Sequence, residues 1–306
     1  MTKLREPSEQ NWLDRSSDGG LRLRLLSFAG SGPPILMIHA ASLCAGVWTP
    51  VLAHLDPEMR VLAYDQRGHG DSDAPEDEAS YDWNRFGDDF AAVVETAHEE
   101  FGEPPICVTH SFAGDCAVLA LARRELPVRK LILLDPVLAD EEGATVGAQR
   151  LAKGTRRLGE REAEGFDTRE AVGEALERVL KAQLARDGLD PAAKEAFADW
   201  GSAPDGDGRL RLKCRRDNEA WVYTNRVAIA DHLADKSVDA EVHLVFSKRR
   251  RAKPEDQESA YARDWKVAEG VTSRCRAGKI HPLDGVGHFL VLEAPEVVAT
   301  TIRSLL

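Results

Sequence analysis

The stretch Pro105-Ile-Cys-Val-Thr-His-Ser-Phe-Ala-Gly114 decides the fold of this chain. Its first residues are apolar or β-branched, as in a buried strand, and an alanine-rich apolar run at 117–122 is typical of a helix. Ser111 therefore lies in a tight turn between a strand and a helix. A serine in such a turn stands clear of the sheet beside the N–H groups that begin the helix, which is the arrangement that a nucleophilic hydroxyl requires.

The turn departs from the common G-x-S-x-G pattern, because Thr109 and Ala113 stand where glycines are usual. The turn is sterically crowded, and Ala113 meets the need for a small residue more easily than Thr109 does. The same residues also fit a serine that only caps the following helix. The stretch by itself thus leaves two interpretations of Ser111, a nucleophile or a helix cap.

Apolar runs at 34–38, 60–65 and 130–135 repeat the strand signal, and segments with helical spacing separate them. This alternation predicts an α/β fold with a mostly parallel central sheet flanked by helices. Residues 139–234 show helical runs and no convincing strand, so we expect a helical cap inserted into a core of residues 1–138 and 235–306. Further strands are expected at 240–246 and 279–283, where Pro282 favours an edge position.

Composition excludes several classes of protein. The 306 residues carry a net charge of −12, which argues against nucleic-acid binding. The five cysteines are widely spaced with no C-x-x-C pair, so neither a zinc site nor a disulfide framework is indicated.

No stretch approaches the ~20 apolar residues of a membrane span. We expect a soluble cytoplasmic protein that acts on a small molecule without a metal or cofactor. The sequence does not indicate its oligomeric state.

Five separated motifs occur in one order, and together they resemble the α/β-hydrolase fold superfamily over nearly the whole chain. They are His39–Trp48, Asp65–Ser72 with its D-x-R-G-x-G-x-S pattern, Thr109–Gly114, Leu133–Pro136 and Gly285–Pro295. The resemblance implies that Ser111 is the nucleophile and His288 its general base. It also implies an oxyanion hole made by the backbone N–H groups of Phe112 and Ala41. We interpret His69 and His110 as structural.

The acid of the expected triad is the clearest departure from the superfamily pattern. Many relatives carry an aspartate after the seventh strand, where Arg250 stands in this sequence. An arginine cannot stabilise an imidazolium. Asp135, at the end of the strand before the insertion, is the favoured substitute, because a branch of the superfamily draws its acid from that position. Glu255 and Asp256 remain the alternative.

The resemblance implies hydrolysis of an ester, or of a related acyl or carbon–carbon bond, through a Ser-His-Asp triad. A serine nucleophile speaks against the dehalogenase and epoxide-hydrolase branches, which need a carboxylate. Two alternatives stay open: a cofactor-independent dioxygenase of an N-heteroaromatic substrate, and a non-catalytic ligand-binding homologue. The cap would set substrate shape, and Trp200, Trp221 and Tyr223 are candidates for lining its pocket.

Overall fold

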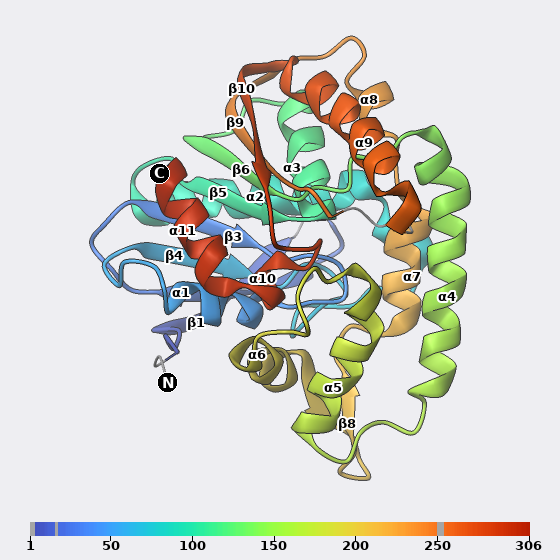
Figure 1. The fold of residues 1–306 in the computed structure, drawn as a ribbon. Coiled ribbons are helices and arrows are strands. Elements are labelled where there is room, and N and C mark those ends of the chain that lie inside the picture. Colours follow the sequence, from blue (N-terminus) through green and yellow to red (C-terminus); the bar gives the residue numbers. More distant parts are fainter. Residues whose placement is uncertain (1–3, 16–17, 250–253) are drawn as a thin grey trace.

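The computed structural model describes residues 4–15, 18–249 and 254–306. Its centre is an eight-stranded sheet in the order β1-β2-β4-β3-β5-β6-β9-β10 (Figure 1). All neighbours from β4 to β10 pair in parallel, whereas β1 and β2 form an antiparallel edge. The strands are β1 (Glu9–Arg15), β2 (Leu21–Phe28), β3 (Pro34–Ile38), β4 (Arg60–Tyr64), β5 (Ile106–His110), β6 (Lys130–Leu134), β9 (Val238–Ser247) and β10 (Cys275–Leu283).

Helices cover both faces of this sheet (Figure 1). On β5, Cys107 packs into the core beneath one face, and Ile106 and Val108 pack into the core beneath the other. The first core also contains residues of α2 (Trp83–Phe101), α3 (Phe112–Arg123) and α9 (Gln257–Thr272). The second contains residues of α1 (Thr49–Leu52) and α11 (Pro295–Leu305). Strands buried on both faces explain the continuous apolar runs, and the predicted α/β class is confirmed.

Local signals set the ends of the longest helix, α2. The side chain of Asp82 accepts a hydrogen bond from the Asn84 N–H and so satisfies one of the N–H groups that begin the helix. Gly102 follows the helix with a φ of 73°, a left-handed conformation that costs glycine little. These residues fix where α2 begins and ends beneath the sheet.

The segment between β6 and β9, which contains residues 139–234, is called the insertion below. Its main helices are α4 (Ala148–Arg161), α5 (Arg169–Leu180), α6 (Pro191–Gly201), α7 (Arg216–Thr224) and the short α8 (Ile229–His232). The expectation of no strand here is wrong, because β7 (Ser202–Pro204) and β8 (Leu210–Leu212) form a small hairpin. Three-residue strands are too short to show an alternating pattern. The edge position predicted from Pro282 is correct, since β10 ends the sheet.

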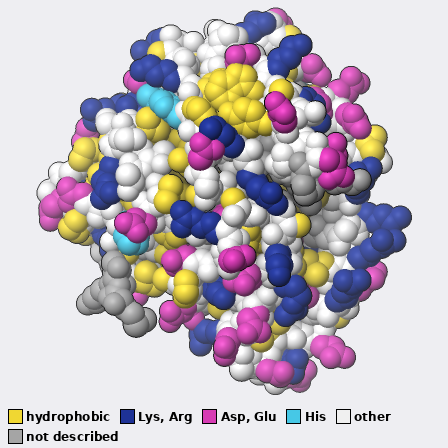
Figure 2. All heavy atoms as spheres, viewed as in Figure 1, with side chains coloured by type: hydrophobic (Ala, Val, Ile, Leu, Met, Phe, Trp, Pro, Cys, Tyr) yellow, Lys and Arg dark blue, Asp and Glu magenta, His cyan; other side chains and the backbone are white. Residues whose placement is uncertain are grey.

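The insertion packs directly onto the core. Trp200 of α6 lies against Gly46, where an added Cβ would come within 2.0 Å of the indole. Only glycine leaves room for this contact. Figure 2 shows Lys and Arg side chains interspersed with Asp and Glu over the insertion helices on the face viewed. No helix among the described residues is long and apolar enough to cross a membrane.

Candidate active site

Ser111 occupies the turn between β5 and α3 in a strained conformation. Its φ is 60° and its ψ is −135°, and such a left-handed φ costs a non-glycine residue about 1–3 kcal/mol. The backbone is held there by bonds from Ser111 N–H to Leu134 O (3.0 Å) and from Gly114 N–H to Ser111 O (2.9 Å). The Ser111 side chain does not cap α3. The helix-cap interpretation therefore does not account for this hydroxyl.

The hydroxyl instead begins a chain of hydrogen bonds through His288 to Asp135. Ser111 Oγ lies 2.9 Å from His288 Nε2, and His288 Nδ1 lies 2.7 Å from Asp135 Oδ2. The second carboxylate oxygen of Asp135 accepts a 2.8 Å bond from the Ser247 N–H. Because a carboxylate only accepts, His288 donates from Nδ1 and its Nε2 is free to accept the serine proton. Asp135 is 1% exposed.

Two contacts hold the turn that carries His288. His110 donates from Nε2 to the His288 carbonyl at 2.8 Å, and burial lowers the pKa of His110 to about 3, so the ring is neutral. Glu293 is the last residue of α10 (Leu290–Glu293), and one of its carboxylate oxygens accepts the Gly287 N–H at 2.6 Å. Its other oxygen accepts the Ala185 N–H of the insertion at 2.7 Å. One buried carboxylate thus joins the histidine turn to the insertion.

Two neutral histidines shape the loop that contains Ala41. His39 donates from Nδ1 to Ala40 O at 2.7 Å and accepts the Gln66 N–H on Nε2 at 3.0 Å. His69 accepts the Ser42 N–H at 3.1 Å, and burial lowers its pKa to about 4. The structural interpretation of His69 agrees with these contacts. They fix the backbone of the loop from both sides.

Asp115 organises the chain just beyond Asp135, a role that the sequence analysis missed. Its two carboxylate oxygens accept the N–H groups of Val137 (2.9 Å) and Leu138 (3.0 Å). Both Asp135 and Leu138 have a positive φ, of 44° and 49°, so the segment needs such support. Burial raises the pKa of Asp115 to about 7. A charged residue in the otherwise apolar run 112–121 was the available signal.

We expect Asp115 to make stability depend on pH. The pKa of Asp115 is near 3.8 in the unfolded chain and about 7 in the folded protein. Between these two pH values the folded state holds a proton that the unfolded state has lost. Relative to Asp115→Asn, the wild type should therefore lose about 3 kcal/mol of unfolding free energy from pH 5 to pH 8. Urea unfolding of both proteins at the two pH values measures this, and other titrating groups cancel in the difference. If the two proteins differ by the same unfolding free energy at both pH values, the pKa of Asp115 is not raised in the folded state.

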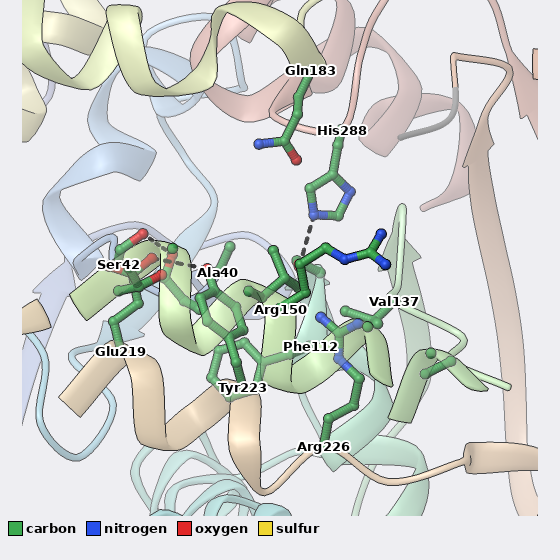
Figure 3. Close-up of a pocket in the computed structure, with 18 of the residues that line it drawn as sticks. Ala40, Ser42, Phe112, Val137, Arg150, Gln183, Glu219, Tyr223, Arg226 and His288 are labelled. Atoms are coloured by element: carbon green, nitrogen blue, oxygen red, sulfur yellow. Dashed lines mark hydrogen bonds between the residues drawn. The ribbon is translucent and has the colours of Figure 1, made fainter. Parts of the chain in front are cut away.

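A cavity of about 890 Å³ opens above the carboxyl ends of the strands. That volume lies within the usual range for small-molecule sites. Ser111, His288, Asp135, Ala41 and Phe112 all line it, and Figure 3 shows His288 and Phe112 on its walls. The structure thus brings together the residues of the favoured triad and of the expected oxyanion hole. The N–H of Phe112 begins α3 and has no acceptor within the helix.

The other candidates, apart from Tyr223, lie away from the cavity. Glu255 and Asp256, the alternative acids, are exposed where α9 begins and do not line it. Of the three aromatic candidates only Tyr223 lines the cavity. Trp200 packs on Gly46, and Trp221 contacts Tyr81 with ring centroids 5.3 Å apart. Arg250, the residue in place of the usual acid, falls outside the described residues. Among those described, no cluster of three or more potential ligand residues could hold a metal.

A mostly parallel sheet flanked by helices, with a serine in the sharp turn between a strand and the following helix, is the arrangement of the α/β-hydrolase fold. A family profile described as "Alpha/beta hydrolase family" matches residues 35–301. The chain belongs to this family.

Curated relatives match only part of their length. A 2-(acetamidomethylene)succinate hydrolase of Mesorhizobium japonicum is 34% identical over 106 residues, which cover 35% of this chain and 36% of that protein. Lipase LipV of Mycobacterium tuberculosis is 32% identical over 120 residues, or 38% of this chain and 42% of the relative. The chain therefore spans well under half the length of these relatives in the matched segments. Such partial matches support a hydrolase and leave the substrate unspecified.

Solved structures match nearly the whole chain. The crystal structure of E-2-(acetamidomethylene)succinate hydrolase has a TM-score of 0.73 and 22% identity, and the match covers 97% of this chain and 98% of the other. A thermophilic esterase from Thermogutta terrifontis has a TM-score of 0.65 and 20% identity, with coverage of 97% and 98%. At these identities the likeness shows the fold alone.

Proposed function

We propose that the protein is a serine hydrolase that cleaves an ester or a related acyl bond of a small molecule. The observation that carries this proposal is the hydrogen-bonded chain from Ser111 Oγ through His288 to Asp135. The three residues come from separate parts of the chain and meet at the floor of one cavity. The hydrolase and lipase names of the relatives agree with this chemistry.

In the proposed reaction, His288 Nε2 takes the proton of Ser111 as Oγ attacks the substrate carbonyl. The negative charge that develops on the carbonyl oxygen accepts hydrogen bonds from the N–H groups of Phe112 and Ala41. His288 then gives its proton to the leaving alcohol or amine, and an acyl-enzyme remains on Ser111. A water molecule repeats the sequence and releases the acid. Asp135 stabilises the imidazolium in both halves.

Asp135 is the proposed acid because it alone among the candidates contacts His288 and still lies on the floor of the cavity. Its backbone N–H donates to Val245 O at 2.8 Å, which ties the end of β6 to β9. Its side chain is held at both oxygens, by Ser247 and by His288. A carboxylate fixed in this way holds the imidazole in the tautomer that general-base catalysis needs. The insertion, residues 139–234, acts in this proposal as the cap that sets substrate shape.

Labelling with a fluorophosphonate tests the proposal, because this reagent phosphonylates an activated serine. We expect the wild type to be labelled and Ser111→Ala to stay unlabelled, and we expect the wild type to hydrolyse 4-nitrophenyl esters in a chain-length panel. An unlabelled and inactive wild type would favour the non-catalytic binding homologue. Oxygen consumption with an N-heteroaromatic substrate, without ester turnover, would favour the dioxygenase.

A further inference from the structure

The positive lining of the cavity stands out against the negative charge of the whole protein. The net charge of the chain is −12. The described residues that line the cavity nevertheless include arginines from several helices and loops, and no lysine. Among them are Arg150 of α4, Arg216 of α7, Arg226 between α7 and α8, Arg249 after β9 and Arg263 of α9.

Some of this charge is neutralised by neighbouring carboxylates. Arg216 pairs with Glu162 at 2.8 Å and with Glu219 at 2.6 Å. Arg263 lies 3.1 Å from Asp264 and 3.8 Å from Asp140. These pairs belong to the structure of the insertion and its contact with α9. They leave these two arginines with protein partners already in place.

Arg150 and Arg249 differ from those pairs. Arg150 is exposed and forms no hydrogen bond or ion pair with any residue that the structure describes, although it lines the cavity. Arg249 carries a buried Nε that has no hydrogen-bond partner among the described residues. Figure 3 shows the side chains of Arg150 and Arg226 extending into the cavity that also contains His288. A buried donor with no partner is costly unless a ligand supplies the acceptor.

We infer that the substrate carries a carboxylate besides its scissile acyl group, and that Arg150 binds this carboxylate with help from Arg249. The planar guanidinium fork matches two carboxylate oxygens, which favours arginine over lysine for such a site. Positive charge in a concave, partly enclosed site also concentrates anions there against an acidic protein surface. This inference rests on the proposed function and names the substrate class for the same cavity.

A pair of esters with acyl chains of equal length tests the inference. In 4-nitrophenyl hydrogen adipate the acyl chain ends in a carboxylate, whereas in 4-nitrophenyl hexanoate it ends in a methyl group. We expect the wild type to favour the adipate ester in kcat/KM by about tenfold or more, the worth of one charge-assisted hydrogen bond. Arg150→Gln should reduce this ratio by a similar factor. Arg156→Gln is the matched control, because Arg156 lies on the same helix outside the cavity and should leave the ratio unchanged.

A binding measurement separates this inference from the proposed chemistry. Isothermal titration of Ser111→Ala with adipate should show binding that adipamide, its neutral analogue, lacks. Adding Arg150→Gln should weaken the adipate affinity by about tenfold or more. Adipate binding without ester turnover in the wild type would overturn the proposed function and keep the carboxylate site. Turnover of both esters at equal kcat/KM, with no adipate binding, would overturn the carboxylate site and keep the hydrolase.

Discussion

Ser111→Ala is expected to lower kcat for a 4-nitrophenyl ester by about 10⁴-fold or more. The substitution removes the only atom that can form the acyl-enzyme in the proposed reaction, while the backbone contacts of the elbow remain. His288→Ala should cost a similar factor. The double variant should be no worse than either single variant, because the two side chains act as one unit. Stopped assays of released nitrophenol, with thermal unfolding to check the fold, measure these effects.

A control serine makes the result specific. Ser273 is exposed at the end of α9, where its hydroxyl donates to Gly270 O, and Ser273→Ala should keep the wild-type rate. If Ser111→Ala retains more than about a tenth of the wild-type kcat, hydrolysis proceeds without the acyl-enzyme, because loss of a true nucleophile costs far more. The proposed mechanism would then be wrong, even though the fold and family stand.

Asp135→Asn is expected to lower kcat by about 10³–10⁴-fold. The amide oxygen would keep the bond from the Ser247 N–H, which Asp135 Oδ1 now accepts. That choice turns the amide NH2 toward His288 Nδ1, and two donors would face each other. The tautomer of His288 with its proton on Nε2 would then be favoured. In that tautomer Nε2 cannot accept the proton of Ser111. The substitution should change kcat more than KM.

The alternative acids provide the comparison for Asp135. Glu255→Gln and Asp256→Asn should behave as wild type, because both side chains are exposed and neither lines the cavity. Near-normal activity of Asp135→Asn, together with loss of activity in either of the other two variants, would show that the acid was assigned to the wrong residue. The same kinetic assay serves all three proteins.

Short motifs predicted the sheet and the convergence of Ser111, His288 and Asp135. Each lies in a turn whose sequence pattern is local, so one chain shows it without coordinates. The identity of the acid needed a further argument, because nothing near Asp135 in sequence reveals that its side chain meets an imidazole 153 positions away. That contact depends on the parallel pairing of β6 with β9.

Other features could not be predicted for physical reasons. The β7–β8 hairpin is too short for a period-two pattern, and the extension of β10 back to Cys275 includes a register shift that breaks the pattern. Asp115 and Glu293 are single acidic residues within apolar surroundings, and their partners are backbone N–H groups. Backbone N–H groups have no sequence signature. Only the folded structure therefore shows which carboxylate accepts hydrogen bonds from which loop.

The two attachments of Glu293 limit how the segment between β6 and β9 can be replaced. One of its oxygens accepts the N–H of Gly287, next to His288, and the other accepts the N–H of Ala185 in the insertion. A chimera that received a foreign insertion without an amide at that place would leave half of a buried carboxylate unsatisfied, at a cost of about 1–3 kcal/mol. This loss of stability would affect the turn at Gly287, which positions the imidazole of His288. Any replacement of the insertion therefore has to keep the backbone geometry of residues 183–186.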